Sequence, residues 1–216
     1  MADSRWAGVA PRAAVSIALL ASVAACSSAT SGSKPAGTPG AVAGRATLAP
    51  WDRPADQDVQ VQAAGLTLTA TEQVAVHYHA HLDVIVRGTA VPVPAELGIN
   101  VGPDNTAPPH GSPGIAALHT HDVTGILHIE APAAAVFTLG QLFTEWNVAL
   151  SRGQVGAYRI GDSSGDRVRV FVNGVPTTTD PAAIALTAHE EIAVVVDSAA
   201  QPATGIPSSY AFPPGD

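Results

Sequence analysis

The sequence predicts a mainly β domain of the α+β class, in which antiparallel hairpins form a small sheet or sandwich with one packed helix. The 216-residue chain is 46% hydrophobic but only 13% charged, a balance that allows a core and argues against a coiled coil. Its 20 glycines and 18 prolines supply many turns. Apolar and polar residues alternate through several short segments, as strands with one buried face require.

Two segments have the pattern of a β-hairpin. One covers residues 81–93 with a tight turn at Arg87-Gly88, and the other covers 167–177 with a turn at Asn173-Gly174, a favoured residue pair for such turns. Each hairpin leads into a proline, an apolar stretch and a histidine that precedes another alternating strand. This similarity indicates a weak internal duplication.

One helix is expected after Thr138, whose side chain suits the N-cap position. The apolar residues that follow recur at i, i+3, i+4 and i+7, so they form a single stripe. The stripe consists of Leu139, Leu142, Phe143 and Trp146. We expect it to pack on the core.

The first 25 residues have the features of a secretory signal peptide. An apolar run at 13–25 follows two arginines and is shorter than the ~20 residues that a transmembrane helix needs. The run ends in Val-Ala-Ala-Cys26, which resembles the bacterial lipobox. The resemblance implies that Cys26 is acylated, for example with palmitate, and anchors the chain on the outer, extracytoplasmic face of the cell membrane. The alternative is a plain signal peptide with an incidental cysteine.

The exported part divides into three segments. Residues 26–58 are rich in Ser, Gly, Pro and Ala and are predicted to be a disordered tether. Residues 59–199 form the histidine-rich β domain, in which Val59 and Val61 begin the first strand material. Residues 200–216 are predicted to be an irregular tail rich in Pro and Ser.

The first histidine cluster lies on one expected strand. Because side chains alternate between the faces of a strand, His77, His79, His81 and Asp83 share one face. The even-numbered residues from 78 to 86, Tyr78 among them, share the apolar face and must look into the core. The histidines therefore face away from the core.

The second cluster predicts a pairing. A four-residue turn at 122–125 would place His119 opposite His128, with Cβ atoms about 4.5–5.5 Å apart, and His121 opposite Ile126. Glu130 falls on the same face. A register slip of one residue would expose the apolar face, so this register is favoured.

These histidines predict a site for a divalent transition metal. Two histidines at i and i+2 with a third on the next strand can converge on one ion, a geometry similar to the three-histidine zinc site of carbonic anhydrase. If the two clusters are adjacent, their six histidines suffice for one rich site or two metals. Glu130 or Asp122 could add a ligand or fix a histidine tautomer. Asp83 and His189 are further candidates, whereas His110 is expected to be a bystander.

The choice of metal follows from the ligands. The predicted β domain has no Cys or Met, which disfavours Cu(I) and blue-copper sites. Imidazole with carboxylate suits Zn(II), Cu(II), Ni(II) or Fe(II), with zinc and Cu(II) ranked first. The net charge of −8 argues against a nucleic-acid partner.

Three functions are open at this point. The first is a metal-binding lipoprotein for scavenging, buffering or delivery. The second is a metalloenzyme in which Glu130 or Asp122 acts as general base on a metal-bound water. The third is an accessory subunit of a cell-envelope complex, in which the histidines contact a partner protein.

Three motifs together resemble exported bacterial and archaeal domains of unassigned function. They are HxHxHL from His77, LHTHDxTGILHIE at 118–130 and FTLGQLFxEW at 137–146. The resemblance covers about a third of the chain, from His77 to Leu150. It implies that the histidine pattern is a feature of the domain, and it implies no activity.

Overall fold

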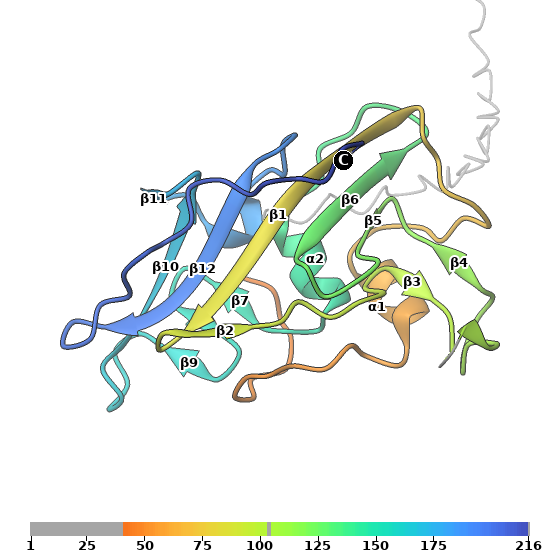
Figure 1. Ribbon diagram of the computed structural model, residues 1–216. Coiled ribbons are helices and arrows are strands. Elements are labelled where there is room, and N and C mark those ends of the chain that lie inside the picture. The colour runs from red at the N-terminus through yellow and green to blue at the C-terminus, as the bar shows by residue number, and fades with distance from the viewer. Residues whose placement is uncertain (1–40, 103–104, 216) are drawn as a thin grey trace, which may run out of the picture. The chain divides into compact units, whose positions relative to one another are not determined.

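The computed structural model describes residues 41–102 and 105–215, which form the mainly β, α+β fold that the sequence predicts (Figure 1). The predicted signal peptide, Cys26 and the tether up to residue 40 lie outside the described residues. The helical elements are α1 (Gln57–Ala63), α2 (Leu139–Glu145) and the short 3-10 helix η2 (Pro181–Ala183). The strands are β1 (Val76–Val86), β2 (Thr89–Val91), β3 (Ile99–Asn100), β4 (Gly114–Ile115), β5 (Leu118–His119), β6 (Ile126–Ala131), β7 (Leu150–Ser151), β8 (Gln154–Val155), β9 (Tyr158–Arg159), β10 (Asp166–Val172), β11 (Val175–Thr177) and β12 (Glu191–Ser198).

The main sheet has seven strands in the order β11-β10-β12-β1-β6-β5, with β2 paired to β1. Both predicted hairpins are confirmed as β1–β2 and β10–β11. Their turn residues Arg87-Gly88 and Asn173-Gly174 all have positive φ, as tight two-residue turns of the primed type require. Later in the chain, β6 pairs antiparallel with β1, and β12 pairs antiparallel with β10. A parallel pair, β1 with β12, joins the two halves.

The core lies on one face of the sheet. β1 contributes the even-numbered apolar residues from Ala80 to Val86, as its alternation predicts. Helix α2 packs behind the sheet (Figure 1). Thr138 precedes it as the N-cap residue, and its side chain forms a reciprocal capping box with Gln141. The predicted apolar stripe of α2, ending at Trp146, is fully buried. The predicted packed helix is therefore confirmed.

The described part of the predicted tether, residues 41–58, differs from the prediction. Trp51 is a core residue, 3% exposed, whose Nε1 donates to Thr47 O at 2.9 Å. Residues 57–63 form helix α1 where strand material was expected. Gln57 and Val61, four residues apart, are its buried positions, whereas Val59 is 53% exposed. The spacing of the valines looked like strand alternation, but burial follows the i, i+4 spacing of a helix.

The C-terminal tail forms neither helix nor strand over its described residues 200–215. It nevertheless covers the face of the sheet opposite the core. Ala203 and Ile206 pack against a small apolar cluster of Phe171, Ala193 and Val195. Figure 1 shows the tail crossing β12 and β1 in dark blue. The face that carries the histidines is therefore partly covered by the end of the chain.

Candidate metal centre

Three adjacent strands each bring an i, i+2 pair of potential ligands to the same face of the sheet. In the register of the strands, His79 lies opposite His128, His77 opposite Glu130, and His119 opposite His128 from the other side. The pairing of His119 with His128 is the one that the sequence predicts. These side chains, with His121 just after β5, are called here the His/Glu array. The array consists of His77, His79, His119, His121, His128 and Glu130.

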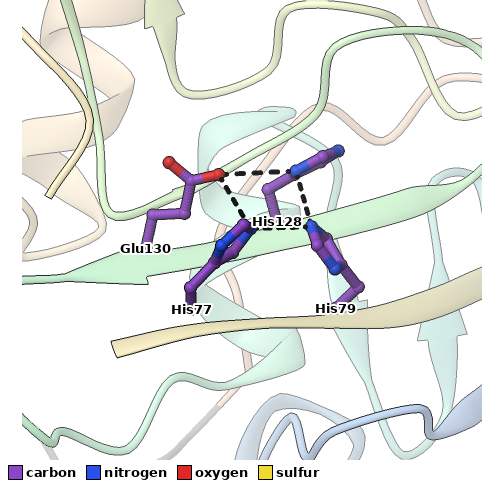
Figure 2. Close-up of side chains that lie close together, drawn as sticks. All are labelled: His77, His79, His128 and Glu130. Carbon is purple, nitrogen blue, oxygen red and sulfur yellow. Dashed lines mark hydrogen bonds and ion pairs between the residues drawn. The ribbon is translucent and has the colours of Figure 1, made fainter. Parts of the chain in front are cut away.

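The first half of the array joins β1 to β6. His77 Nε2 lies 3.2 Å from His79 Nε2, and His79 Nε2 lies 2.9 Å from His128 Nδ1. Glu130 Oε1 lies 3.4 Å from His77 Nε2 and 3.6 Å from His128 Nδ1. Figure 2 shows the three imidazoles and one carboxylate oxygen directed at a common point. A tetrahedral ion with Zn–N bonds of about 2.0–2.1 Å holds its ligands about 3.3 Å apart, so this spacing could hold a metal ion.

The second half joins β6 to β5 and shares His128 and Glu130 with the first. His119 Nε2 lies 3.3 Å from His121 Nε2 and 3.9 Å from Glu130 Oε1. The ligand atoms of this group of four all lie within 4.8 Å of one another, as do those of the first group. The array thus contains two overlapping groups that could hold a metal ion.

His119 is fixed in the tautomer that a metal ligand needs. Its ring is fully buried, and Nδ1 donates to Ala116 O at 2.9 Å. The lone pair of Nε2 therefore points into the array, as in sites where a backbone carbonyl orients a metal-binding histidine. Burial, together with the neighbouring histidines His121 and His128, lowers the pKa of His119 to about 3. The imidazole is neutral at physiological pH and needs no deprotonation to bind a metal.

Glu130 is the acid of the array. Its side chain is only 4% exposed, and burial raises its pKa, with Glu72 adding to the effect. Oε1 faces the imidazoles, whereas Oε2 is buried and has no hydrogen-bond partner among the described residues. A buried carboxylate oxygen without a partner is costly, and a bound cation would remove that cost.

His81, a predicted ligand, is not brought into either of these groups. Its Nδ1 lies 2.8 Å from Glu191 Oε2, and its Nε2 lies 2.8 Å from Thr124 O. Burial opposes the charge, but these hydrogen bonds outweigh it and raise the pKa of His81. His81 and Glu191 therefore form a buried ion pair, with Asp83 Oδ2 3.9 Å from Nδ1. With Asp83 and Glu191, His81 forms a separate group of three whose ligand atoms lie within 4.8 Å of one another and could hold a metal ion.

The tail covers this ion pair. The ring of Tyr210 stacks on His81 with centroids 3.8 Å apart and planes 8° apart. Phe212 lies beside Tyr210. Its ring also contacts His189, with the two ring centroids 4.9 Å apart. The tail thus separates the His81–Glu191 pair from solvent, and it leaves His77 and His121 as the exposed ends of the array, at 42% and 44% side-chain exposure.

The remaining candidates lie outside the array. Asp122 accepts hydrogen bonds from the backbone and side chain of Thr124, which lower its pKa and hold it in the turn. His189 N donates to His79 O and its ring contacts Phe212. His110 lies 3.3 Å from Asp56 on the surface.

Glu72 is an acidic neighbour of the array that the sequence did not single out. Its Oε1 lies 3.6 Å from His121 Nε2, and its side chain is 47% exposed. It precedes β1 in a polar stretch without periodicity, so no pattern in the sequence marked it. The structure adds a second carboxylate at the outer end of the array.

Comparisons of the chain with models of protein families, with curated proteins and with solved structures find no match. Within residues 41–102 and 105–215, no helix has the length and apolar character needed to cross a membrane.

Proposed function

We propose that the chain is a membrane-anchored extracytoplasmic lipoprotein whose domain binds a divalent transition metal through the His/Glu array, for scavenging, buffering or delivery. The observation that carries the metal-binding part is the spacing of the donor atoms. Neighbouring donors lie 2.9–3.9 Å apart, and His119 presents a neutral nitrogen fixed by Ala116 O. The lipobox at Cys26 supports the anchor.

The ligand set favours zinc or Cu(II). The array offers imidazole nitrogens and a carboxylate, and the single cysteine of the chain is Cys26. These donors suit borderline divalent ions, whereas Cu(I) prefers thiolate and thioether sulfur.

Binding is favoured over catalysis by the number of protein ligands. Each group of four supplies three imidazoles and Glu130, which fill a tetrahedral shell. Catalytic zinc sites leave one position open for water or substrate, whereas sites that only hold the metal close all four. Glu130 is then a ligand and is not available as a general base, and Asp122 is held in its turn.

Elemental analysis tests the site. Full chain expressed without a tag, with Zn, Cu, Ni, Fe and Mn all supplied, is expected to retain metal through gel filtration. The double variant His119→Ala/His128→Ala removes ligands from both groups and is expected to lose it. His110→Ala is the matched control, because its side chain is 66% exposed and lies outside the array. Equal metal content in the double variant and the control would refute the site, provided that thermal melts show both folded.

Replacement of the anchor residue tests the localisation. Cys26→Ala removes the only thiol that could be acylated, so the protein is expected to appear in the medium or to remain unprocessed. Membrane fractionation and the mass of the mature chain give the readout. Processed Cys26→Ala protein that stays with the membrane as the wild type does would contradict the anchor.

A further inference from the structure

Resting on the proposed metal binding, we propose that the array holds two ions at the same time, bridged by the carboxylate of Glu130. The first ion would take His77, His79 and His128 together with Glu130. The second would take His119 and His121 together with Glu130, with Glu72 completing its shell. The proposal follows from how the donor atoms are grouped, from the position of Glu130 and from the presence of Glu72.

The donor atoms form a row that is too long for one ion. The His77–His79 pair and the His119–His121 pair never fall in the same group of four, and each is joined to the other only through His128 and Glu130. Along the row, neighbouring nitrogens lie 3.2 Å apart at one end and 3.3 Å apart at the other. A single ion would bind one of these two histidine pairs and would leave the other pair without a metal ion between its imidazoles.

Glu130 stands where the two groups meet. Its Oε1 lies 3.4 Å from His77 Nε2 and 3.9 Å from His119 Nε2, so it reaches both ends of the row. Figure 2 shows the second oxygen turned away from His77, His79 and His128. That oxygen is buried and lacks a hydrogen-bond partner in the described part of the chain. Oε1 thus faces both groups and can bridge the two ions, and the nearby cations would offset the cost of the unpaired second oxygen.

The two shells need not compete for His128. Its Nδ1 lies 2.9 Å from His79 Nε2, which assigns it to the first ion. The second ion then has two imidazoles and Glu130. Glu72 belongs to neither group of four, but its Oε1 lies 3.6 Å from His121 Nε2, and its half-exposed side chain can turn inward to supply the fourth ligand. Each ion thus has four protein ligands, with Glu130 shared. Carboxylate-bridged pairs of this kind hold their ions about 3.5–4 Å apart.

Metal stoichiometry in matched variants tests this arrangement. Full-length apo protein titrated with Cu(II) is expected to bind two ions per chain, and so is the control His110→Ala. His77→Ala should lose the first ion only, and both His121→Ala and Glu72→Gln the second only. The three replaced side chains are 42–47% exposed, so the variants are expected to fold. Electron paramagnetic resonance of the wild type should show two coupled Cu(II) ions, and Glu130→Gln should abolish the coupling.

The outcomes separate this inference from the proposed function. One ion per wild-type chain would overturn the two-ion centre and leave metal binding intact, and no bound ion would overturn both. Two ions without magnetic coupling would overturn the bridge. Loss of all metal in both His77→Ala and His121→Ala would show a single shared ion and would also overturn the inference.

Discussion

Replacement of Trp146 by alanine is expected to lower the free energy of unfolding by about 3–5 kcal/mol, the range for removal of a buried aromatic side chain. Trp146 is fully buried at the end of α2, and its ring meets Trp51 edge-on with centroids 5.6 Å apart. Its Nε1 also donates to Trp51 O at 2.9 Å, so the variant leaves that carbonyl without its donor. Because small domains are stable by only about 5–15 kcal/mol, the loss is a large share of the total.

Urea unfolding followed by circular dichroism measures this effect. Trp146→Phe keeps most of the ring but removes the N–H group, so it should cost less than the alanine variant. Val136→Ala is the surface control, because Val136 is 74% exposed, and its change should stay within about 0.5 kcal/mol. A Trp146→Ala protein as stable as the control would mean that residues 41–58 do not pack on α2 through Trp51.

Local sequence patterns predicted the parts of the fold that depend on residues adjacent in the sequence. The turn pairs Arg87-Gly88 and Asn173-Gly174 specify hairpins because their positive φ angles suit few other arrangements. Thr138 and the apolar stripe behind it specify α2 in the same way. By contrast, α1 has only two buried positions, Gln57 and Val61. Gln57 is polar, so the sequence shows no apolar repeat at helical spacing here. Its burial depends on tertiary hydrogen bonds with Gly98 N and Glu145 O, which the sequence does not reveal.

In the candidate site, too, the sequence predicted what depends on local pattern and did not predict what depends on tertiary contacts. Alternation along one strand placed His77 and His79 on a common face, and a four-residue turn paired His119 with His128. The separation of His81 from the array could not be predicted, because its partner Glu191 is 110 residues away and joins it through the parallel pair of β1 and β12. Tyr210, which stacks on His81, comes from a tail whose composition indicated only irregular structure.

Glu145 is a second buried acid, separate from the array. It lies in α2 with 0% exposure, and both of its carboxylate oxygens lack a hydrogen-bond partner in the described part of the chain. The carboxyl lies against Gly98, where an added Cβ would come within 3.2 Å of Oε1. Burial raises the pKa of Glu145 well above its ordinary value of 4.5. The folded protein therefore keeps this acid protonated at pH values where the unfolded chain ionises it.

Glu145→Gln is accordingly expected to stabilise the protein at neutral pH and to leave its stability unchanged below pH 4.5. The folded pKa of Glu145 is raised, so unfolding releases a proton above the unfolded pKa. As the pH rises from the unfolded to the folded pKa of Glu145, the free energy of unfolding of the wild type therefore falls by about 1.4 kcal/mol per pH unit because of this one group. Glutamine has nearly the same shape and never ionises, so the variant escapes that loss.

Urea unfolding of both proteins at a series of pH values between 4 and 8 measures the difference. Glu130, Glu190 and Glu191 also have raised pKa values, but they are present in both proteins and cancel in the comparison. The quantity to follow is therefore the stability of the variant minus that of the wild type, which should rise with pH from near zero. A difference that stays constant across the series would mean that Glu145 finds a partner or water when ionised, and that this end of α2 is less enclosed than its zero exposure implies.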